Sequence, residues 1–230
     1  EDDKVEIRDA RKFWGMRSTD FDKSIVNELG DRRFETCYIG PSGENMVRYS
    51  AILHTVGRAA GRGGVGCVMG SKNLKAIAVK GTRMPGVADH KMFINHLEKI
   101  RESLHNQFSR YGTAAGVTSQ SDRGRQAVKN FREGTSLEAG KIGGIAAEQM
   151  IWVRDMACYC CPQACKKIGV SRNGQYGKYI VEGPEYETGT MLGTNLLIHD
   201  LDGLMKLIGE VDEYGLDQIS VGNVIGFLME

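Results

Sequence analysis

The chain has 230 residues, of which 41% are hydrophobic and 26% charged, and its formal net charge is +1. This balance is typical of globular proteins and provides for one large domain or two modest ones. No apolar run of about 18 residues is present that would span a membrane, and the near-zero charge gives no indication of nucleic acid, so neither is an expected partner. Six cysteines without an export signal indicate a reducing cytoplasm.

The first third of the chain, through residue 81, is predicted to be rich in strands and turns. We expect strands at residues 5–8, 34–39, 46–53 and 76–80, a turn at residues 40–43 and an amphipathic helix at residues 20–29. The chain opens in a strand pattern without an initiator Met, so we expect that earlier residues are missing.

A glycine-rich stretch at residues 57–75 contains six glycines, two arginines and two lysines. Glycines let the backbone approach a ligand closely, and the cationic side chains would hold phosphates. It is not a dinucleotide fingerprint, because no strand leads into it and a strand rather than a long helix is expected to follow. It is not a phosphate-binding P-loop, because residues 70–72 lack the required spacing and order of glycines. A flexible connection is the alternative interpretation.

Beyond residue 81 the hydrophobic pattern becomes helical. Helices are predicted at residues 92–107, 146–156, 190–197, 201–214 and 220–230, joined by loops and short turns. The fold class is therefore α+β, with a β-rich domain at residues 1–81 and a mostly helical domain at residues 82–230.

The run from Cys158 to Cys165 is the strongest chemical signal in the sequence. Cys158, Cys161 and Cys165 have a C-x2-C-x3-C spacing, which would bring three thiolates to one turn. Iron–sulfur clusters commonly take three cysteines from one run, and a proline such as Pro162 is frequent beside them. A zinc site usually needs a second ligand pair, which is not found, and unliganded thiols are a further alternative. Cys160 is interpreted as a packed bystander.

Four motifs in one order resemble the tungsten-containing aldehyde:ferredoxin oxidoreductase family. They are the glycine-rich stretch, the cysteine run, the sequence Gly-Pro-Glu-Tyr-Glu at 183–187 and the sequence Asp-x-x-Gly-Leu-Asp at 212–217. The resemblance covers essentially the whole chain. It implies a tungsten or molybdenum bis-pterin, a 4Fe-4S cluster and a magnesium ion that bridges the pterin phosphates. It also implies an aldehyde substrate and electron transfer to ferredoxin or an electron-transfer subunit, and it leaves a homo-oligomer open.

The resemblance also assigns roles to individual residues. The cluster ligands are Cys158, Cys161 and Cys165; the cofactor-binding residues are Arg58, Ala59, Arg62, Gly63, Gly64, Asp212, Leu216 and Asp217; and the catalytic carboxylate is Glu187. Arg58 would pair with a phosphate and the Ala59 carbonyl would bind magnesium.

The proposed role of Glu187 is consistent with the chemistry. Aldehyde oxidation adds an oxygen from water and releases protons, so a carboxylate near the metal is useful as a base. Glu182 and Glu185 lie close in sequence, and in an extended segment Glu185 and Glu187 would share a face. A solvated acidic turn is the alternative without function.

Two departures from the family pattern affect the interpretation. The family has a second Asp-x-x-Gly-Leu motif and a fourth cluster cysteine, but no cysteine follows Cys165 here, so the chain is expected to be an internal fragment. Tungsten-dependent benzoyl-CoA reductase shares the glycine-rich and cysteine motifs, yet it supplies a cysteine where this chain has residues 182–188. Aldehyde oxidation is therefore favoured. An iron–sulfur electron-transfer module and a structural zinc module are the alternatives from other classes.

Overall fold

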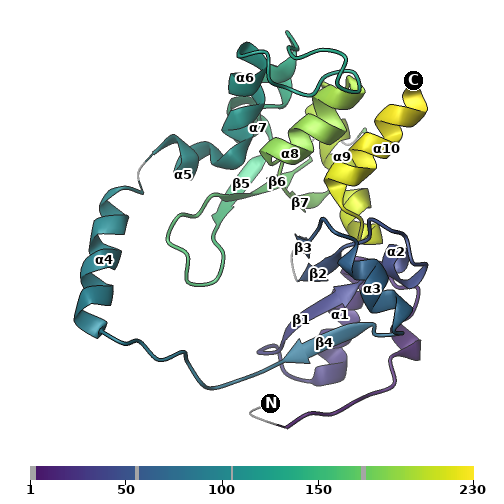
Figure 1. The fold of residues 1–230 in the computed structure, drawn as a ribbon, viewed down its shortest axis with the longest axis vertical. Helices are drawn as coiled ribbons and strands as arrows, with labels where there is room; N and C mark the ends of the chain where they lie inside the picture. The colour runs from purple at the N-terminus through teal and green to yellow at the C-terminus, as the bar shows by residue number, and fades with distance from the viewer. Residues whose placement is uncertain (1–3, 55–56, 105, 172–174) are drawn as a thin grey trace.

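The computed structural model describes residues 4–54, 57–104, 106–171 and 175–230 (Figure 1). The strands are β1 (Glu35–Ile39), β2 (Ile52–His54), β3 (Arg58–Ala60), β4 (Ala76–Val79), β5 (Trp152–Met156), β6 (Lys166–Val170) and β7 (Ile180–Glu182). The longer helices are α1 (Ser18–Leu29), α4 (His90–Glu102), α6 (Ala115–Asp122), α9 (Leu201–Tyr214) and α10 (Gln218–Met229). The shorter helices are α2 (Pro41–Glu44), α3 (Val65–Ser71), α5 (Gln107–Tyr111), α7 (Gly144–Met150) and α8 (Tyr186–Thr188). A π-helical turn, η4 (Gly189–Gly193), continues α8.

The N-terminal part is a four-stranded antiparallel sheet in the order β3-β2-β1-β4. Phe21 and Ile25 of α1 are buried against Tyr38 and Leu53, which point from neighbouring strands into the same small core. These side chains recur at helical spacing on α1, so their burial stabilises both the helix and the sheet. Because β3 pairs with β2, the sheet fixes the position of the first part of the glycine-rich segment.

A buried ion pair joins α2 to the segment before β4. Lys75 Nζ donates to the Glu44 carboxylate at 2.5 Å and to the Ile39 carbonyl at 2.7 Å, and neither charged side chain is more than 3% exposed. The second Glu44 oxygen accepts from the Gly15 amide at 2.7 Å. Burial lowers the pKa of Lys75, which Glu44 opposes. The pair therefore ties the glycine-rich segment to the sheet.

The C-terminal part has its own core around α9. Leu204, Met205 and Ile208 of this helix are fully buried against Leu192 of the π-helical turn and Ile142. A second antiparallel sheet in the order β5-β6-β7 lies against this helix, with Gly169 of β6 next to Met205. Figure 1 shows α4 on the connection between the N-terminal and C-terminal parts, set apart from both. Among the described residues no helix is both long and apolar enough to cross a membrane.

The α+β class is confirmed, with differences in detail. The strand predicted at 5–8 is irregular. The strand predicted at 46–53 begins only at Ile52, because residues 47–50 form a turn in which the Ser50 amide donates to the Val47 carbonyl at 3.0 Å. Residues 40–43 lead into α2 rather than forming a simple turn. The helix predicted at 92–107 ends at Glu102 and α5 follows, with position 105 outside the described residues.

Residues 146–156 were expected to be one helix, but the helix ends at Met150. Residues 152–156 pair instead with 166–169 as strands β5 and β6, and Trp152 lies opposite Gly169. This pairing connects segments on the two sides of the cysteine run, so it cannot be seen in local periodicity. The region expected to be mostly helical therefore also contains a sheet, and the cysteine run connects two of its strands.

Candidate functional site

The Asp-x-x-Gly-Leu-Asp motif leaves α9 and joins the N-terminal part of the chain. The Ala51 amide donates to the Gly215 carbonyl at 2.8 Å, and the Asp217 amide donates to the Tyr49 carbonyl at 3.0 Å. Gly215 ends α9 with φ of 73°, and an added Cβ would lie 2.9 Å from the Gly40 nitrogen. Both the left-handed backbone and the close approach require glycine here. The motif thus acts as a backbone joint between the two parts.

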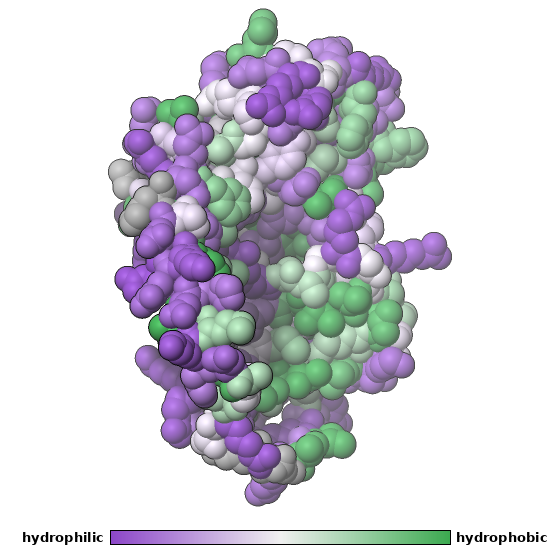
Figure 2. All heavy atoms as spheres, turned by 60° about the vertical axis from the view of Figure 1, so that its left-hand side comes forward, coloured by the Kyte–Doolittle hydropathy of each residue, from purple (hydrophilic) through white to green (hydrophobic). Residues whose placement is uncertain are grey.

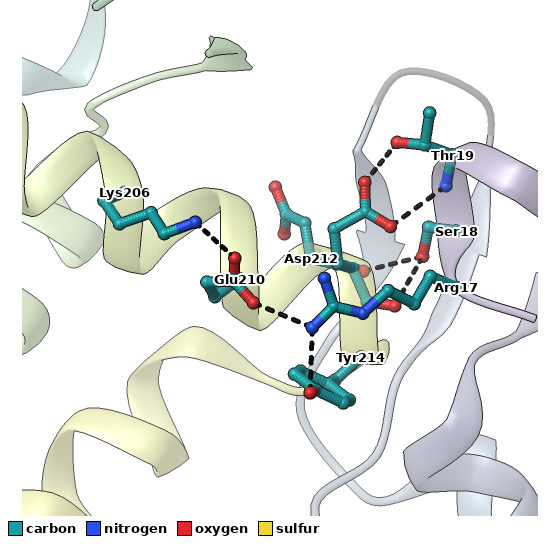
Figure 3. A network of polar contacts seen from close by, with 8 residues as sticks. Arg17, Ser18, Thr19, Lys206, Glu210, Asp212 and Tyr214 are labelled. Carbon is teal, nitrogen blue, oxygen red and sulfur yellow. Dashed lines mark hydrogen bonds and ion pairs between the residues drawn. The ribbon is translucent and has the colours of Figure 1, made fainter. Parts of the chain in front are cut away.

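Polar side chains at the start of α1 strengthen this joint (Figure 3). Ser18 Oγ donates to the Asp212 carbonyl at 2.7 Å, and Thr19 donates from its amide and its hydroxyl to the Glu213 carboxylate. Arg17 reaches Glu210 and Tyr214 from the same helix end. The end of α9 therefore has one defined position against α1, which fixes the first aspartate of the motif.

The glycine-rich segment passes directly beside both aspartates of the motif. A Cβ added to Gly57 would lie 3.1 Å from Asp212 Oδ2, and one added to Gly61 would lie 3.2 Å from Asp217 Oδ1. The two aspartates therefore flank strand β3, which carries Arg58 and Ala59. Side chains larger than hydrogen at the two glycine positions would displace the carboxylates. Two of the four motifs singled out in the sequence, the glycine-rich stretch and the Asp-x-x-Gly-Leu-Asp sequence, therefore meet here.

The loop at residues 62–64 leaves β3 with an unusual backbone. Gly63 and Gly64 have φ of 97° and 69°, and an added Cβ on Gly64 would lie 2.2 Å from the Arg48 carbonyl oxygen. Arg62 is exposed at the start of the loop. Helix α3 follows immediately at Val65, where no helix was predicted. The segment is an ordered loop and helix, not a flexible connection.

The two aspartates of the motif have different surroundings. Asp217 is 5% exposed and caps α10, because its Oδ2 accepts from the Ser220 amide at 2.9 Å. Asp212 is partly buried, and its Oδ1 accepts from Gln218 Nε2 at 2.6 Å. Burial raises the pKa of Asp212 to about 7, and Glu182 and Glu213 add to the rise. Asp212 is therefore a carboxyl that can carry a proton near neutral pH.

Arg58 points from β3 to Glu182 at the end of β7. The guanidinium forms an ion pair with Glu182, whose second oxygen lies 3.9 Å from Lys166 Nζ. Glu182 and Lys166 are 7% and 8% exposed, and burial raises the pKa of Glu182 against the opposing effect of the two cations. Lys166 directly follows Cys165, so one buried carboxylate connects the glycine-rich segment with the strand after the cysteine run. Sequence reasoning weighed Glu182 only as a rival to Glu187 and missed Lys166.

The cysteine run forms the loop between β5 and β6. Cys158, Cys160 and Cys161 are exposed, Cys165 is half-buried, and all are free thiols. Cys160 was expected to be packed, but it lies on the surface with φ of 54°. Burial raises the pKa of Cys165, with smaller contributions from Glu185, Cys158 and Cys161. In the described part of the chain no three His, Cys, Asp or Glu side chains gather closely enough to hold a metal ion, so the thiols lie on one loop without forming a closed site.

The two glutamates of the Gly-Pro-Glu-Tyr-Glu sequence face different surroundings. Glu185 begins α8, where its carboxylate accepts from the Thr113 hydroxyl and forms a capping box with Thr188. Glu187 lies within α8 and is exposed. The segment is helical rather than extended, so the two side chains do not alternate as a strand would place them. Glu185 is the carboxylate that lies near the cysteines and Glu187 the one free to meet solvent or a ligand.

A cleft of about 490 Å³ lies between the N-terminal part and the cysteine loop. Its lining includes His54, Arg58, Cys158, Tyr159 and Lys166. The side of the molecule in Figure 2 is hollowed, with apolar residues gathered along one wall. The structure thus brings Arg58 and the first cysteine to one cleft and sets Asp212 and Asp217 beside Gly57 and Gly61. It does not bring Glu187 into the lining of this cleft.

Comparison with known proteins finds matches to most of the chain. Residues 1–81 match the N-terminal domain of aldehyde ferredoxin oxidoreductase, and residues 91–230 match domains 2 and 3 of the same enzyme. The chain belongs to the aldehyde ferredoxin oxidoreductase family. Tungsten-containing aldehyde ferredoxin oxidoreductases of Pyrococcus abyssi and Pyrococcus furiosus are 39% and 40% identical over 235 residues. These alignments cover all of this chain and 38% of each relative, so the chain spans well under half of the relatives' length.

The chain is also similar to two proteins with other names. The aliphatic sulfonate oxidoreductase, WOR-like subunit, of Pyrococcus furiosus is 38% identical over 99% of this chain and 39% of its own length. A solved structure, the active site complex BamBC of benzoyl coenzyme A reductase in complex with 1,5-dienoyl-CoA, superposes with a TM-score of 0.76 at 26% identity. That superposition covers 99% of this chain and 36% of the other.

The residues present fit a phosphate-bearing cofactor, and the residue types of the cysteine run suit a sulfur-ligated metal. Arg58 Nε is buried without a hydrogen-bond partner among the described residues, and the glycines at 57 and 61 leave open the space that a Cβ would fill. An arginine with unused donors beside close-approaching backbone suits an anionic group. The cysteine run offers only sulfur donors, which favour iron–sulfur or zinc over hard cations, although the described thiols are not gathered into a closed site.

Proposed function

We propose that this chain forms part of a tungstopterin and iron–sulfur oxidoreductase that converts aldehydes to carboxylic acids. The observation that carries the proposal is the meeting of the Asp-x-x-Gly-Leu-Asp motif with the glycine-rich segment. Backbone hydrogen bonds of Gly215 and Asp217 place the two aspartates on either side of β3. Separate stretches of sequence thus converge on one surface, as a cofactor site requires.

The pterin would be held by residues of both parts of the chain. Arg58, Arg62 and the backbone of Gly63 and Gly64 would bind phosphates, and the Ala59 carbonyl would bind magnesium. Asp212, Leu216 and Asp217 would hydrogen-bond a pterin ring. The raised pKa of Asp212 supports this assignment, because a carboxyl that keeps its proton can donate a hydrogen bond as well as accept one.

The cysteine loop would hold the 4Fe-4S cluster through Cys158, Cys161 and Cys165. The tungsten, or molybdenum, cofactor would supply the two-electron oxidation, and the cluster would pass the electrons on singly. Oxidation of an aldehyde with water yields a carboxylate, two electrons and three protons. Glu187 would accept one of these protons, because its exposed carboxylate can reach a ligand. The buried π-helical turn that continues α8 would hold the backbone of Glu187 in place. Ferredoxin or an electron-transfer subunit would receive the electrons in the reducing cytoplasm, and a homo-oligomer stays open.

Reduction of an aromatic ring is the second candidate. It is favoured by the similarity in fold to the benzoyl coenzyme A reductase complex. Residues 182–188 contain no cysteine, whereas the resemblance implies one there in that branch, so aldehyde oxidation has priority.

Anaerobic assays on the purified, metal-loaded protein distinguish the two candidates. We expect aldehyde-dependent reduction of ferredoxin or a viologen dye, with the carboxylate formed in a one-to-one ratio to the electron pairs. Dienoyl-CoA formation from benzoyl-CoA, with no activity toward a panel of aliphatic and aromatic aldehydes, would overturn the proposal.

A further inference from the structure

Glu182 lies at a junction with Arg58 and Lys166, and these three residues lie in or directly beside three of the sequence motifs. Glu182 precedes the Gly-Pro-Glu-Tyr-Glu sequence, pairs with Arg58 of the glycine-rich segment and lies 3.9 Å from Lys166, which follows the cysteine run. Its side chain is 7% exposed, while that of Arg58 is 34% exposed. The carboxylate is therefore enclosed, and the guanidinium reaches from it toward the surface that borders the cleft.

The pairing leaves part of the Arg58 guanidinium available. An arginine has five N–H donors in a planar fork, and phosphate recognition uses two of them on one edge. The described pair with Glu182 uses Nη2, and Nε, which lies on the same edge, is buried without a partner among the described residues. The edge that carries Nη1 is therefore the one left for a phosphate. The long arginine side chain would otherwise sample many rotamers, so a fixed carboxylate at one edge sets the plane of the other.

The charges at the junction are also suited to an anion. Arg58 and Lys166 together carry two positive charges, and Glu182 carries one negative charge, so the three side chains retain one net positive charge. A buried carboxylate is stable here only because both cations face it. A phosphate approaching from the side of the glycine-rich segment would meet an arginine already oriented and still cationic.

We propose that Glu182 is a positioning residue that orients the Arg58 guanidinium for a phosphate group of the cofactor. The inference rests on the proposed function, in which Arg58 binds a pterin phosphate. It predicts that Glu182 strengthens cofactor binding through Arg58 alone. A carboxylate that merely competed with the phosphate for Arg58 would have the opposite effect.

The test compares Glu182→Gln, Arg58→Ala and the double variant in the metal-loaded protein. Tungsten and iron per chain are measured during gel filtration, and folding is followed by circular dichroism. Glu210→Gln is the matched control, because Glu210 also pairs with an arginine across the two parts of the chain, at 3.0 Å from Arg17. We expect Glu182→Gln to lose tungsten roughly tenfold faster than the control while iron is retained. In the Arg58→Ala background it should have no further effect.

The other outcomes refute the inference in distinguishable ways. Unchanged or slower tungsten loss in Glu182→Gln would show that the carboxylate does not orient Arg58, or that it competes with the phosphate. Joint loss of iron and tungsten, with a further loss in the Arg58→Ala background, would show a general structural role. Normal tungsten retention in Arg58→Ala itself would remove the phosphate role of Arg58 from the proposed function, and the inference with it.

Discussion

Substitution of Asp212 by asparagine is expected to remove a pH dependence from the stability of the cofactor-free chain. Burial raises the pKa of this carboxyl from 3.8 to about 7, and the hydrogen bond from Gln218 only partly opposes the rise. Between about pH 4 and pH 7 the folded chain keeps the proton that the unfolded chain has lost. The stabilising contribution is therefore complete below the unfolded pKa and is lost as the pH rises through the folded pKa.

The magnitude follows from the two pKa values. The interval from 3.8 to about 7, at about 1.4 kcal/mol for each pH unit, corresponds to an upper limit of about 4 kcal/mol. Since Asp212 is only partly buried as a residue, a measured change of about 2 kcal/mol would already support the reasoning. Asparagine keeps an acceptor for Gln218 and has no such titration. The free energy of unfolding of the Asp212→Asn chain should therefore rise relative to that of the native chain as the pH increases from 4 to 7. Above pH 7 the difference between the two chains should be constant.

Urea unfolding of both chains at several pH values from 4 to 8 measures this difference. Asp31→Asn is the control, because Arg33 and Lys80 lower the pKa of Asp31 and its contribution is lost on acidification instead. Because that titration lies at more acidic pH, the control should differ from the native chain by a nearly constant amount from pH 4 to pH 8. Parallel stability curves of the native and Asp212→Asn chains from pH 4 to pH 8 would refute the account of Asp212.

Other substitutions test the fold and the site. Lys75→Met leaves a buried carboxylate unpaired and should lower the free energy of unfolding by about 3–5 kcal/mol, against less than about 1 kcal/mol for the exposed Lys141→Met, as measured by urea unfolding. Gly215→Ala places a Cβ 2.9 Å from backbone at positive φ and should cost more than about 1 kcal/mol; equal stability would contradict the described joint. Cys161→Ser should abolish bound iron and turnover, and full iron content would exclude it as a ligand. Glu187→Gln should lower aldehyde turnover while both metals stay bound, whereas loss of tungsten would show a structural role.

Local sequence patterns were sufficient to predict those helices and strands in which the buried residues recur at a regular spacing. The helices around Phe21 and around Leu204 were predicted closely, because their apolar residues recur on one face. Strand β5 was missed, because its partner lies beyond the cysteine run. Helix α3 was missed because glycine is a poor helix former; Gly66 and Gly70 are needed there for close backbone approach to Ala51 and Gly43.

The candidate site could be predicted as a set of motifs but not as a set of contacts. The sequence order of the motifs identified Arg58 and Asp212 as residues of interest. It gave no sign that Arg58 would pair with Glu182, 124 positions later, or that a partly exposed Asp212 would have a raised pKa. Such pairings depend on how the two parts of the chain dock against each other. The hydrophobic periodicity of the sequence carries no information about this docking.

Elemental analysis of the anaerobically purified native protein tests the central claim most directly. Tungsten, or molybdenum in its place, together with about four iron atoms per protein molecule, is the expected result. Zinc alone, with neither iron nor tungsten, would contradict the account and leave the loop around Cys158 as a structural metal site.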